Sequence, residues 1–405
     1  MVTKRYDVVV VGGGTAGIAA AVAAARRGCK TVLIEKQYIP GGLATSGLIY
    51  VYLPICDGHG TQVSKGLAEE LLHRSIVYGP GKIDEYWRGH ADLDRDAKRF
   101  RAVFSPAACV LGWEELLLEA GVDIWYDSLV CAVRMKEKRV THVEVENTSG
   151  RIAVAGKVFV DASGDCSVLR KAGALVSSGE NCQGIWAIEY CEGFKYNPKT
   201  DYYLGQNVKM FWSNGLPPEG AGEEDLLQMS YREPKGKDVS RYAVKTREEL
   251  RGMYKKEYAS GKYDRTTLFP MTLPTMPQFR RIYCIRGREN LHPDEFGVRF
   301  EDSIGLIADW RRVGQVWEIP YGSMLPLNVE GVIAAGRCIA SEGDSWEVTR
   351  VIPAAAVTGE AAGVAASLSC KHRVLPSGLS IRILQRALSV SGIPLHLNEV
   401  GLEYK

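Results

Sequence analysis

The segment from residue 6 to residue 35 constrains the fold more than any other part of the chain. Residues 7–11 are a short apolar, β-branched run that predicts a buried strand. The motif G-x-G-x-x-G follows at Gly12, Gly14 and Gly17. Residues 16–27 are rich in alanine and predict a helix, and residues 30–34 predict a second strand. This order of elements is the layout of a dinucleotide-binding βαβ unit.

The three glycines and one acid indicate a ligand. Gly12 allows a tight turn, Gly14 lets a pyrophosphate approach the backbone, and Gly17 lets the helix pack close to the strand. The helix N-terminus offers free N–H groups and the positive end of its dipole to phosphates. Glu35, at the end of the second strand, suits both hydroxyls of an adenosine ribose and repels an NADP 2′-phosphate. The alternative is an ordinary βαβ unit without a ligand.

Composition excludes several classes of protein. The 405 residues include 50 basic and 48 acidic side chains, which are interspersed and leave a net charge of +2. We therefore expect neither a nucleic-acid nor a membrane partner. No run approaches about twenty uninterrupted apolar residues, and Asp7 with the glycine cluster interrupts any secretory signal. Ten scattered cysteines without a C-x-x-C pair favour reduced thiols in a cytoplasmic protein, and no metal site is expected.

Changes of pattern along the chain predict a discontinuous first domain with an insertion. Amphipathic spacing predicts helices over residues 64–78 and 107–120. Short alternating runs predict an antiparallel meander with strands at 123–126, 130–135, 140–146 and 151–154. Later elements are a buried strand at 157–162, a charged helix at 247–260, a strand at 332–335 and a small-residue helix at 353–369.

The predicted domains follow from these elements. They are a first domain over residues 1–180 with its meander at about 122–156, an inserted α+β substrate or cap domain over 181–320, the second part of the first domain over 321–375, and a helical tail over 376–405.

Three separated segments, at residues 6–47, 157–173 and 331–364, together resemble the FAD-binding domain of the glutathione-reductase-like flavoproteins. More narrowly, the chain resembles FAD-dependent oxidoreductases that are distantly related to the flavoprotein subunits of fumarate reductase and succinate dehydrogenase. The segments most specific to this family are Ala335-Gly336-Arg337-Cys338-Ile339 and Thr349-Arg350-Val351-Ile352-Pro353. The implied fold is α/β: an FAD/NAD(P)-binding Rossmann-like domain with a central parallel sheet and antiparallel meander, plus the inserted α+β domain.

The resemblance implies FAD as the cofactor and a set of residues that hold it. These are Gly12, Gly14, Thr15, Ala16, Gly17, Glu35, Lys36, Gly42, Leu43, Thr45, Ser46, Val130, Ala162, Ser163, Gly164, Gly336, Arg337, Arg350, Val351 and Pro353. The helix that begins near Pro353 would direct its positive end toward flavin N1 and the C2 carbonyl, and so favour the reduced anion. The alternative for this helix is plain packing of small residues.

Flavin chemistry needs a hydride at N5, one acid or base, and charge to orient the substrate. His59 is the predicted acid/base, with Asp57 as a second candidate; a surface or capping histidine is the alternative. Arg350 and Arg281, beside Arg280, are the predicted substrate arginines, with ordinary ion pairs as the alternative.

The predicted function is therefore hydride transfer between a small organic substrate and flavin N5. The expected partners are that substrate and an unidentified electron acceptor or donor, and a homo-oligomer stays open. Two rivals remain: an NAD-dependent dehydrogenase, and a flavin-binding protein without catalysis.

Overall fold

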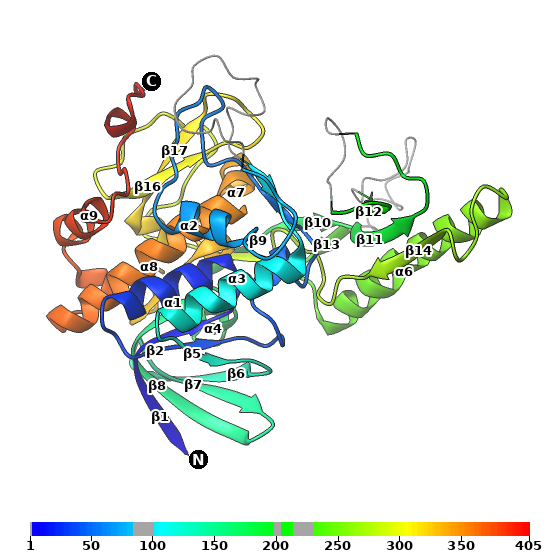
Figure 1. The fold of residues 1–405 in the computed structure, drawn as a ribbon. Helices are drawn as coiled ribbons and strands as arrows, with labels where there is room; N and C mark the ends of the chain where they lie inside the picture. The colour runs from blue at the N-terminus through cyan, green and yellow to red at the C-terminus, as the bar shows by residue number, and fades with distance from the viewer. Residues whose placement is uncertain (1, 84–100, 198–203, 214–229) are drawn as a thin grey trace.

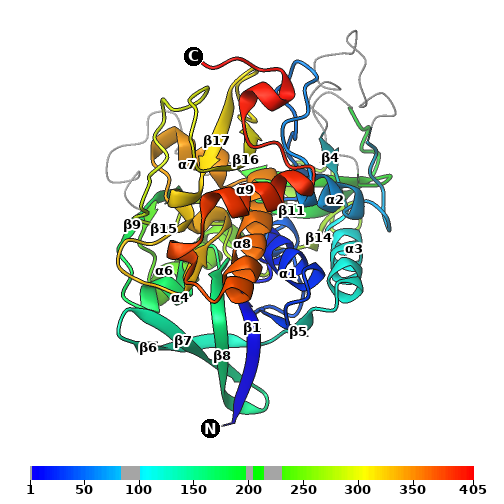
Figure 2. The ribbon, with the colours of Figure 1, turned by 90° about the vertical axis from the view of Figure 1, so that its left-hand side faces the viewer.

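The computed structural model describes residues 2–83, 101–197, 204–213 and 230–405. Parts of the predicted first and inserted domains thus lie outside the described residues. A central sheet organises the fold (Figures 1 and 2). Its strand order is β5-β2-β1-β8-β7-β6, and β18 also pairs with β8.

The core of the sheet is parallel, as the sequence predicts. β1 (Thr3–Val11) lies between β2 (Thr31–Ile34) and β8 (Gly150–Asp161), and runs parallel to both. β18 (Val332–Ala334) runs parallel to the last residues of β8, so the strand that returns more than 300 residues after the first turn is confirmed. The predicted α/β class is also confirmed.

The meander differs from the prediction at both ends. β6 (Leu129–Lys136) and β7 (Arg139–Asn147) form the antiparallel hairpin that the sequence predicts. Residues 123–126, predicted as a meander strand, instead supply β5 (Asp123–Trp125), which runs parallel to β2 because the crossover helix α3 (Pro106–Glu119) precedes it. The runs at 151–154 and 157–162, predicted as two strands, are one strand, β8, which pairs with β7 along its first half and with β18 along its second.

Helices α1 (Thr15–Arg26) and α8 (Ile352–His372) pack against each other on one face of the sheet (Figure 2). The small residues of α8 make this contact close: a Cβ added to Gly359 would lie 2.2 Å from the carbonyl oxygen of Ala16, and one added to Gly363 would lie 2.2 Å from that of Ala20. The predicted small-residue helix therefore does pack tightly, and its N-terminus is positioned by that packing.

We expect Gly363→Ala to destabilise the protein by about 1–3 kcal/mol, because the added methyl group meets a backbone carbonyl and forces two packed helices apart. Gly378→Ala is the matched control, since a Cβ there meets no atom within 4 Å. Denaturant unfolding of both variants measures the difference. Equal midpoints for the two would show that the helix contact tolerates a methyl group.

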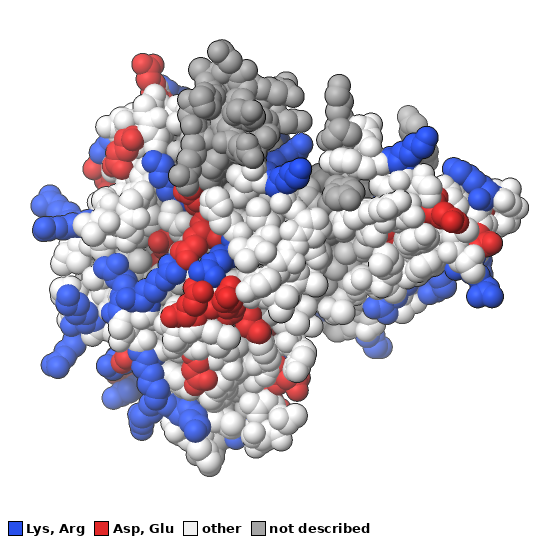
Figure 3. All heavy atoms as spheres, viewed as in Figure 1, with Lys and Arg blue, Asp and Glu red and all other residues white. Residues whose placement is uncertain are grey.

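The other helices and turns surround this core. They are α2 (Leu67–Arg74), α4 (Ser167–Lys171), α7 (Gly343–Thr349), α9 (Ile381–Val390), η1 (Gly42–Ala44), η4 (Tyr321–Met324), η5 (Gly336–Cys338), η6 (Pro376–Gly378) and η7 (Leu397–Val400). Ion pairs join neighbouring helices, such as Arg26 with Glu70 at 2.7 Å, and both signs of charge are mixed on the face shown in Figure 3. Among the described residues no single helix has the length and apolarity to cross a membrane; only α7 and α8 taken together pass that test, and they are bent by 79°.

A second lobe projects from the sheet (Figure 1). It contains a three-stranded sheet, β12 (Val208–Ser213), β11 (Ile185–Cys191) and β14 (Leu268–Thr272), packed on the long helix α6 (Gly236–Ala259). Its own small core is formed by Ile185, Ala187, Cys191, Leu250, Tyr254 and Leu268.

The described residues also form four short two-stranded ribbons. They are β9 (Val176–Ser178) with β15 (Tyr283–Ile285), β10 (Glu180–Cys182) with β13 (Ser230–Arg232), β3 (Val51–Tyr52) with β4 (Ala102–Val103), and β16 (Ser303–Ala308) with β17 (Val316–Pro320). β16 and β17 place side chains such as Ile304 and Trp317 in the main core. The predicted boundaries of the inserted domain stay a prediction.

Glu360 on α8 holds the start of α2. Its Oε2 accepts a hydrogen bond from the backbone N–H of Leu67 at 2.7 Å. Burial, with a smaller effect of nearby Glu70, raises the pKa of Glu360 to about 7. A raised pKa means that the contribution of this group to stability is fully present below its unfolded pKa, about 4.5, and is lost as the pH rises through about 7.

We therefore expect Glu360→Gln to be more stable than the parent at pH 8, by at most about 3 kcal/mol, and to match it near pH 4.5. The glutamine still offers an oxygen to Leu67 and carries no charge. Urea unfolding between pH 4.5 and pH 8 measures the effect, with Glu403→Gln in the exposed tail as the control. A parent and variant with parallel pH profiles would contradict this reading.

Candidate active site

A groove opens at the carboxyl ends of the parallel strands, where dinucleotides bind in α/β sheets. It is formed by the β1–α1 turn, the residues that follow β2, η1, the loop after β8, the segment from η5 to the start of α8, and Met276. The residues that line it are Gly12, Gly14, Thr15, Ala16, Glu35, Lys36, Gln37, Gly41, Gly42, Leu43, Ala44, Ala162, Ser163, Gly164, Met276, Ala335, Gly336, Arg337, Arg350, Ile352 and Ala355.

The three motif glycines serve different purposes. Gly12 adopts φ +101°, and a Cβ on it would lie 2.6 Å from the carbonyl oxygen of Ala162. A Cβ on Gly17 would lie 1.7 Å from the carbonyl oxygen of Gly12, so the predicted close packing at Gly17 is confirmed. At Gly14 a Cβ meets no protein atom within 4 Å. A side chain at residue 14 would project into open space at the groove without disturbing the fold.

Two helix N-termini meet at this groove. α1 begins at Thr15 and α8 at Ile352, and neither N-cap residue makes a side-chain capping bond. Pro353 stands in the first turn of α8, where its missing N–H is not needed. The free N–H groups and the positive dipole ends of both helices favour an anionic ligand, such as a pyrophosphate or a reduced flavin.

Glu35 is the residue predicted to bind the adenosine ribose. Its carboxylate is buried and accepts hydrogen bonds from the backbone N–H groups of Gly13 and Gln37, the latter at 2.7 Å. Burial raises the pKa of Glu35, and these hydrogen bonds oppose the rise. A pocket beside it contains the predicted Val130 together with Lys36 and Ser163. Ribose and adenine contacts at these residues stay predictions.

The groove fits an extended FAD. Besides the open space at Gly14, Ser46 offers a buried hydroxyl that has no hydrogen-bond partner among the described residues, while the neighbouring Thr45 hydroxyl donates to the carbonyl of Pro40 at 2.5 Å. Six of the predicted cofactor residues do not line the groove: Gly17, Thr45, Ser46, Val130, Val351 and Pro353.

The sequence prediction missed several lining residues. Gln37, Gly41, Ala44, Ala335, Ile352 and Ala355 are neighbours in sequence of predicted residues, so a wider reading of the same segments would have included them. Met276 comes from the predicted inserted domain, and no pattern around it indicates a contact with the cofactor.

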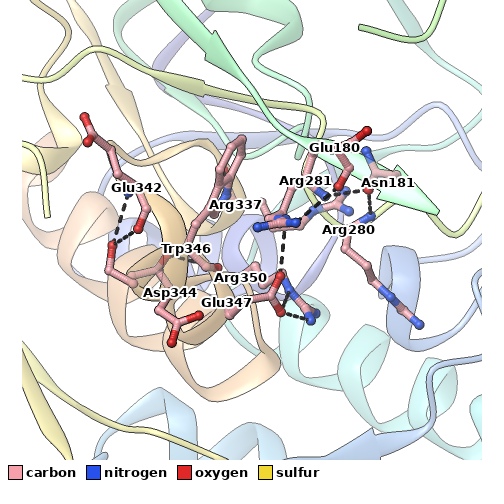
Figure 4. Close-up of polar contacts among 12 residues, drawn as sticks. Glu180, Asn181, Arg280, Arg281, Arg337, Glu342, Asp344, Trp346, Glu347 and Arg350 are labelled. Atoms are coloured by element: carbon pink, nitrogen blue, oxygen red, sulfur yellow. Dashed lines mark hydrogen bonds and ion pairs between the residues drawn. The ribbon is translucent and has the colours of Figure 1, made fainter. Parts of the chain in front are cut away.

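Arg281, Arg337 and Arg350 lie near Glu347, whereas the side chain of Arg280 extends away from this carboxylate (Figure 4). Arg350 forms an ion pair with Glu347 through Nε at 2.8 Å, and the Nε of Arg281 lies 3.2 Å from the other oxygen of Glu347. Arg337 donates to the carbonyl of Phe279 and packs over Gly164. Glu347 thus forms ion pairs with both Arg350 and Arg281.

Arg280 lines a cavity together with Arg281. Its guanidinium lies 5.5 Å from the centre of the Trp186 ring, and no hydrogen bond or ion pair of this group is found among the described residues. Burial, together with the charges of Arg350 and Arg337, lowers the pKa of Arg280. A guanidinium stays protonated at neutral pH even so, and its unmet hydrogen-bonding capacity favours an anion.

The cavity has a volume of about 280 Å³ and lies between the two lobes. It is lined by Glu180, Asn181, Cys182, Gly184, Trp186, Trp212, Ser213, Tyr242, Gln278, Arg280, Arg281 and Glu347. The side-chain oxygen of Asn181 accepts the backbone N–H groups of Arg280 and Arg281 at 2.6 and 2.9 Å, which fixes the backbone of both arginines. Gln278 bridges the lobes, because it donates to the carbonyl of Gly47 and accepts from the N–H of Trp186.

His59 and Asp57 lie in a different place. Asp57 is buried and its Oδ1 accepts the backbone N–H groups of His59 and Thr61, so it organises the loop. The His59 side chain is exposed beside Gly314, in the turn between β16 and β17. Neither residue lines the groove or the arginine cavity. The acid/base assignment of His59 stays a prediction without geometric support.

Comparison with known proteins gives one extended match. The FAD dependent oxidoreductase family matches residues 7–268 and 290–388. Thioredoxin reductase of Ureaplasma parvum is 37% identical over 75 residues, and 3-oxosteroid 1-dehydrogenase of Mycolicibacterium smegmatis is 35% identical over 118 residues. These matches cover 18% and 28% of the chain, and only 24% and 20% of the two relatives.

A solved structure, a geranylgeranyl bacteriochlorophyll reductase-like protein from Thermoplasma acidophilum, aligns with 98% of the chain and 95% of its own length, at 14% identity and a TM-score of 0.47.

Proposed function

The chain belongs to the FAD dependent oxidoreductase family, and on that premise we propose that it transfers hydride between the N5 atom of FAD and a small anionic organic substrate. The observation that carries the proposal is the Arg280 guanidinium, which lines the cavity and forms no hydrogen bond or ion pair with any described residue. Bound FAD supplies the two-electron chemistry that no side chain can provide.

The chain's own residues would bind and orient the reactants. The open space at Gly14 and the N-termini of α1 and α8 hold the negative cofactor, and Arg337 and Arg350 add positive charge at the flavin end. Arg280 binds the negative group of the substrate, while Trp186 and Trp212 contact its apolar part. Glu347 keeps Arg350 and Arg281 in place through the two ion pairs.

Side chains of the cavity lining also limit the access of water to Arg280. Trp186, Tyr242 and Gln278 close the cavity on the side of the second lobe, and the hydrogen bond from Gln278 to Gly47 ties that lobe to the segment after η1. A less hydrated cavity strengthens the attraction between a guanidinium and an anion.

The test is a set of anaerobic flavin titrations with matched pairs of compounds. Oxidised FAD-loaded protein is mixed with hydroxy acids or amino acids and with their uncharged amides, and dithionite-reduced protein is mixed with unsaturated acids and their amides. We expect flavin absorbance to change with at least one acid and to change far more slowly with its amide. Equal rates for acid and amide would contradict the role of Arg280, and an uncharged substrate that outperforms every acid would overturn the proposed substrate class.

A further inference from the structure

The ends of α1 and α8 opposite the groove carry two adjacent cysteines. Cys29 follows α1 and Cys370 stands in the last turn of α8. Both residues lie beside Asp7: the Cys370 thiol is 3.5 Å from the Asp7 carbonyl oxygen, and the backbone N–H of Lys30, next to Cys29, donates to the Asp7 carboxylate at 2.9 Å. Both residues are partly accessible. α8 has 21 residues and is thus about 30 Å long, so this pair is remote from the flavin end of the groove.

A cavity gives solvent access to the pair. We call it the distal cavity; it has a volume of about 470 Å³ and is lined by Asp7, Arg27, Gly28, Cys29, Lys157, Ser367, Leu368, Cys370 and Lys371. Three of these side chains are cationic and one is a carboxylate, and Lys157 forms an ion pair with that carboxylate at 2.6 Å. Positive charge beside a thiol favours the reactive thiolate form.

The two thiols are not equivalent. The adjacent Cys370 thiol lowers the pKa of Cys29; burial and the Asp7 carboxylate oppose this effect, and the Lys157 charge and Ser367 add to it. The adjacent Cys29 thiol, together with burial, raises the pKa of Cys370. The geometry thus supplies one nucleophilic thiolate and one neighbouring thiol that can resolve an oxidised sulfur.

We propose that Cys29 and Cys370 are a peroxide-reactive thiol pair that closes reversibly into a disulfide. The Cys29 thiolate attacks one oxygen of hydrogen peroxide, the O–O bond breaks, and the leaving hydroxide takes a proton to become water. The sulfenic acid on Cys29 is then attacked by the sulfur of Cys370, which forms the S–S bond and releases a second water. Two thiols lose two electrons in total, and one peroxide gains them; a dithiol reductant reverses the change.

The disulfide would join the ends of two helices whose other ends line the cofactor groove. Oxidation would therefore fasten α1 to α8 and raise the unfolding temperature of the protein without altering a residue of the groove. This inference does not depend on the substrate or on the direction of electron flow.

The experiment treats the FAD-loaded full chain with a small excess of hydrogen peroxide, blocks remaining thiols with iodoacetamide, and identifies peptides by mass spectrometry. We expect a peptide pair linked through Cys29 and Cys370 that dithiothreitol separates, and faster loss of free Cys29 than of the exposed Cys182. In Cys370→Ser, dimedone should instead trap a sulfenic acid on Cys29. Cys182→Ser is the matched control and should leave the linked pair unchanged.

Retained flavin absorbance and circular dichroism show that each variant is folded. Three outcomes would overturn the proposal: alkylation of both Cys29 and Cys370 after peroxide, oxidation of Cys182 ahead of Cys29, or overoxidation of Cys29 to sulfinic acid with no linked pair in the parent protein.

Discussion

Gly14→Asp is expected to abolish FAD binding at ordinary concentrations while leaving the fold intact. The added side chain would extend from a position where a Cβ meets no protein atom within 4 Å, into the space where the negative pyrophosphate must approach the backbone. Loss of that approach and the repulsion of like charges should weaken FAD binding at least about 100-fold, or about 2.7 kcal/mol. Fluorescence titration of the FAD-free protein with FAD measures the change.

The control for this variant is Gly252→Asp. Gly252 is exposed on α6, and a Cβ there also meets no atom within 4 Å, so the same chemical change occurs far from the groove. We expect Gly252→Asp to bind FAD like the parent, and both variants to unfold at a similar urea concentration. Unchanged FAD affinity in Gly14→Asp would remove this groove as the pyrophosphate site.

Arg280→Gln is expected to lower kcat/KM for the anionic substrate about 10- to 100-fold, and to do so mainly through KM. The reason is that a charge-assisted hydrogen bond to the substrate is lost from a cavity in which no described side chain forms an ion pair with Arg280. The uncharged amide of the same substrate should lose little. Steady-state kinetics of acid and amide, with the flavin spectrum as a check on cofactor binding, measure the effect.

Arg265→Gln is the matched control, because Arg265 is exposed in the second lobe and does not line the cavity. It should leave both substrates unaffected. An equal loss for acid and amide in Arg280→Gln would indicate a structural role for Arg280 in holding Trp186 rather than a role in binding the anion.

The cofactor-binding part of the fold could be predicted because its signals are local. The βαβ unit shows its strand, turn and helix within thirty residues, and β18 and the small-residue helix α8 each have a clear apolar pattern of their own. β5 was assigned to the wrong partner because three residues carry no periodicity, and only the preceding α3 reveals a crossover connection. The continuity of β8 was hidden because Gly156 interrupts its apolar run.

The substrate site could be predicted only in part. Arg281 and Arg350 could be identified from their neighbours in sequence, but Glu347, which joins them, and Asn181, which fixes the backbone of Arg280, come from separate elements. Their meeting depends on how the second lobe packs on the first. For His59 the sequence was a poor guide. Its residue type and its glycine-containing loop predict an acid/base, but the loop places the ring beside Gly314, outside the groove and the cavity.

The most direct test of the account is the absorption spectrum of the purified protein after reconstitution with FAD and removal of free cofactor. We predict the two visible bands of a bound flavin, at one FAD per chain, and their loss in Gly14→Asp. A protein that stays colourless after reconstitution, and binds NAD instead, would contradict it.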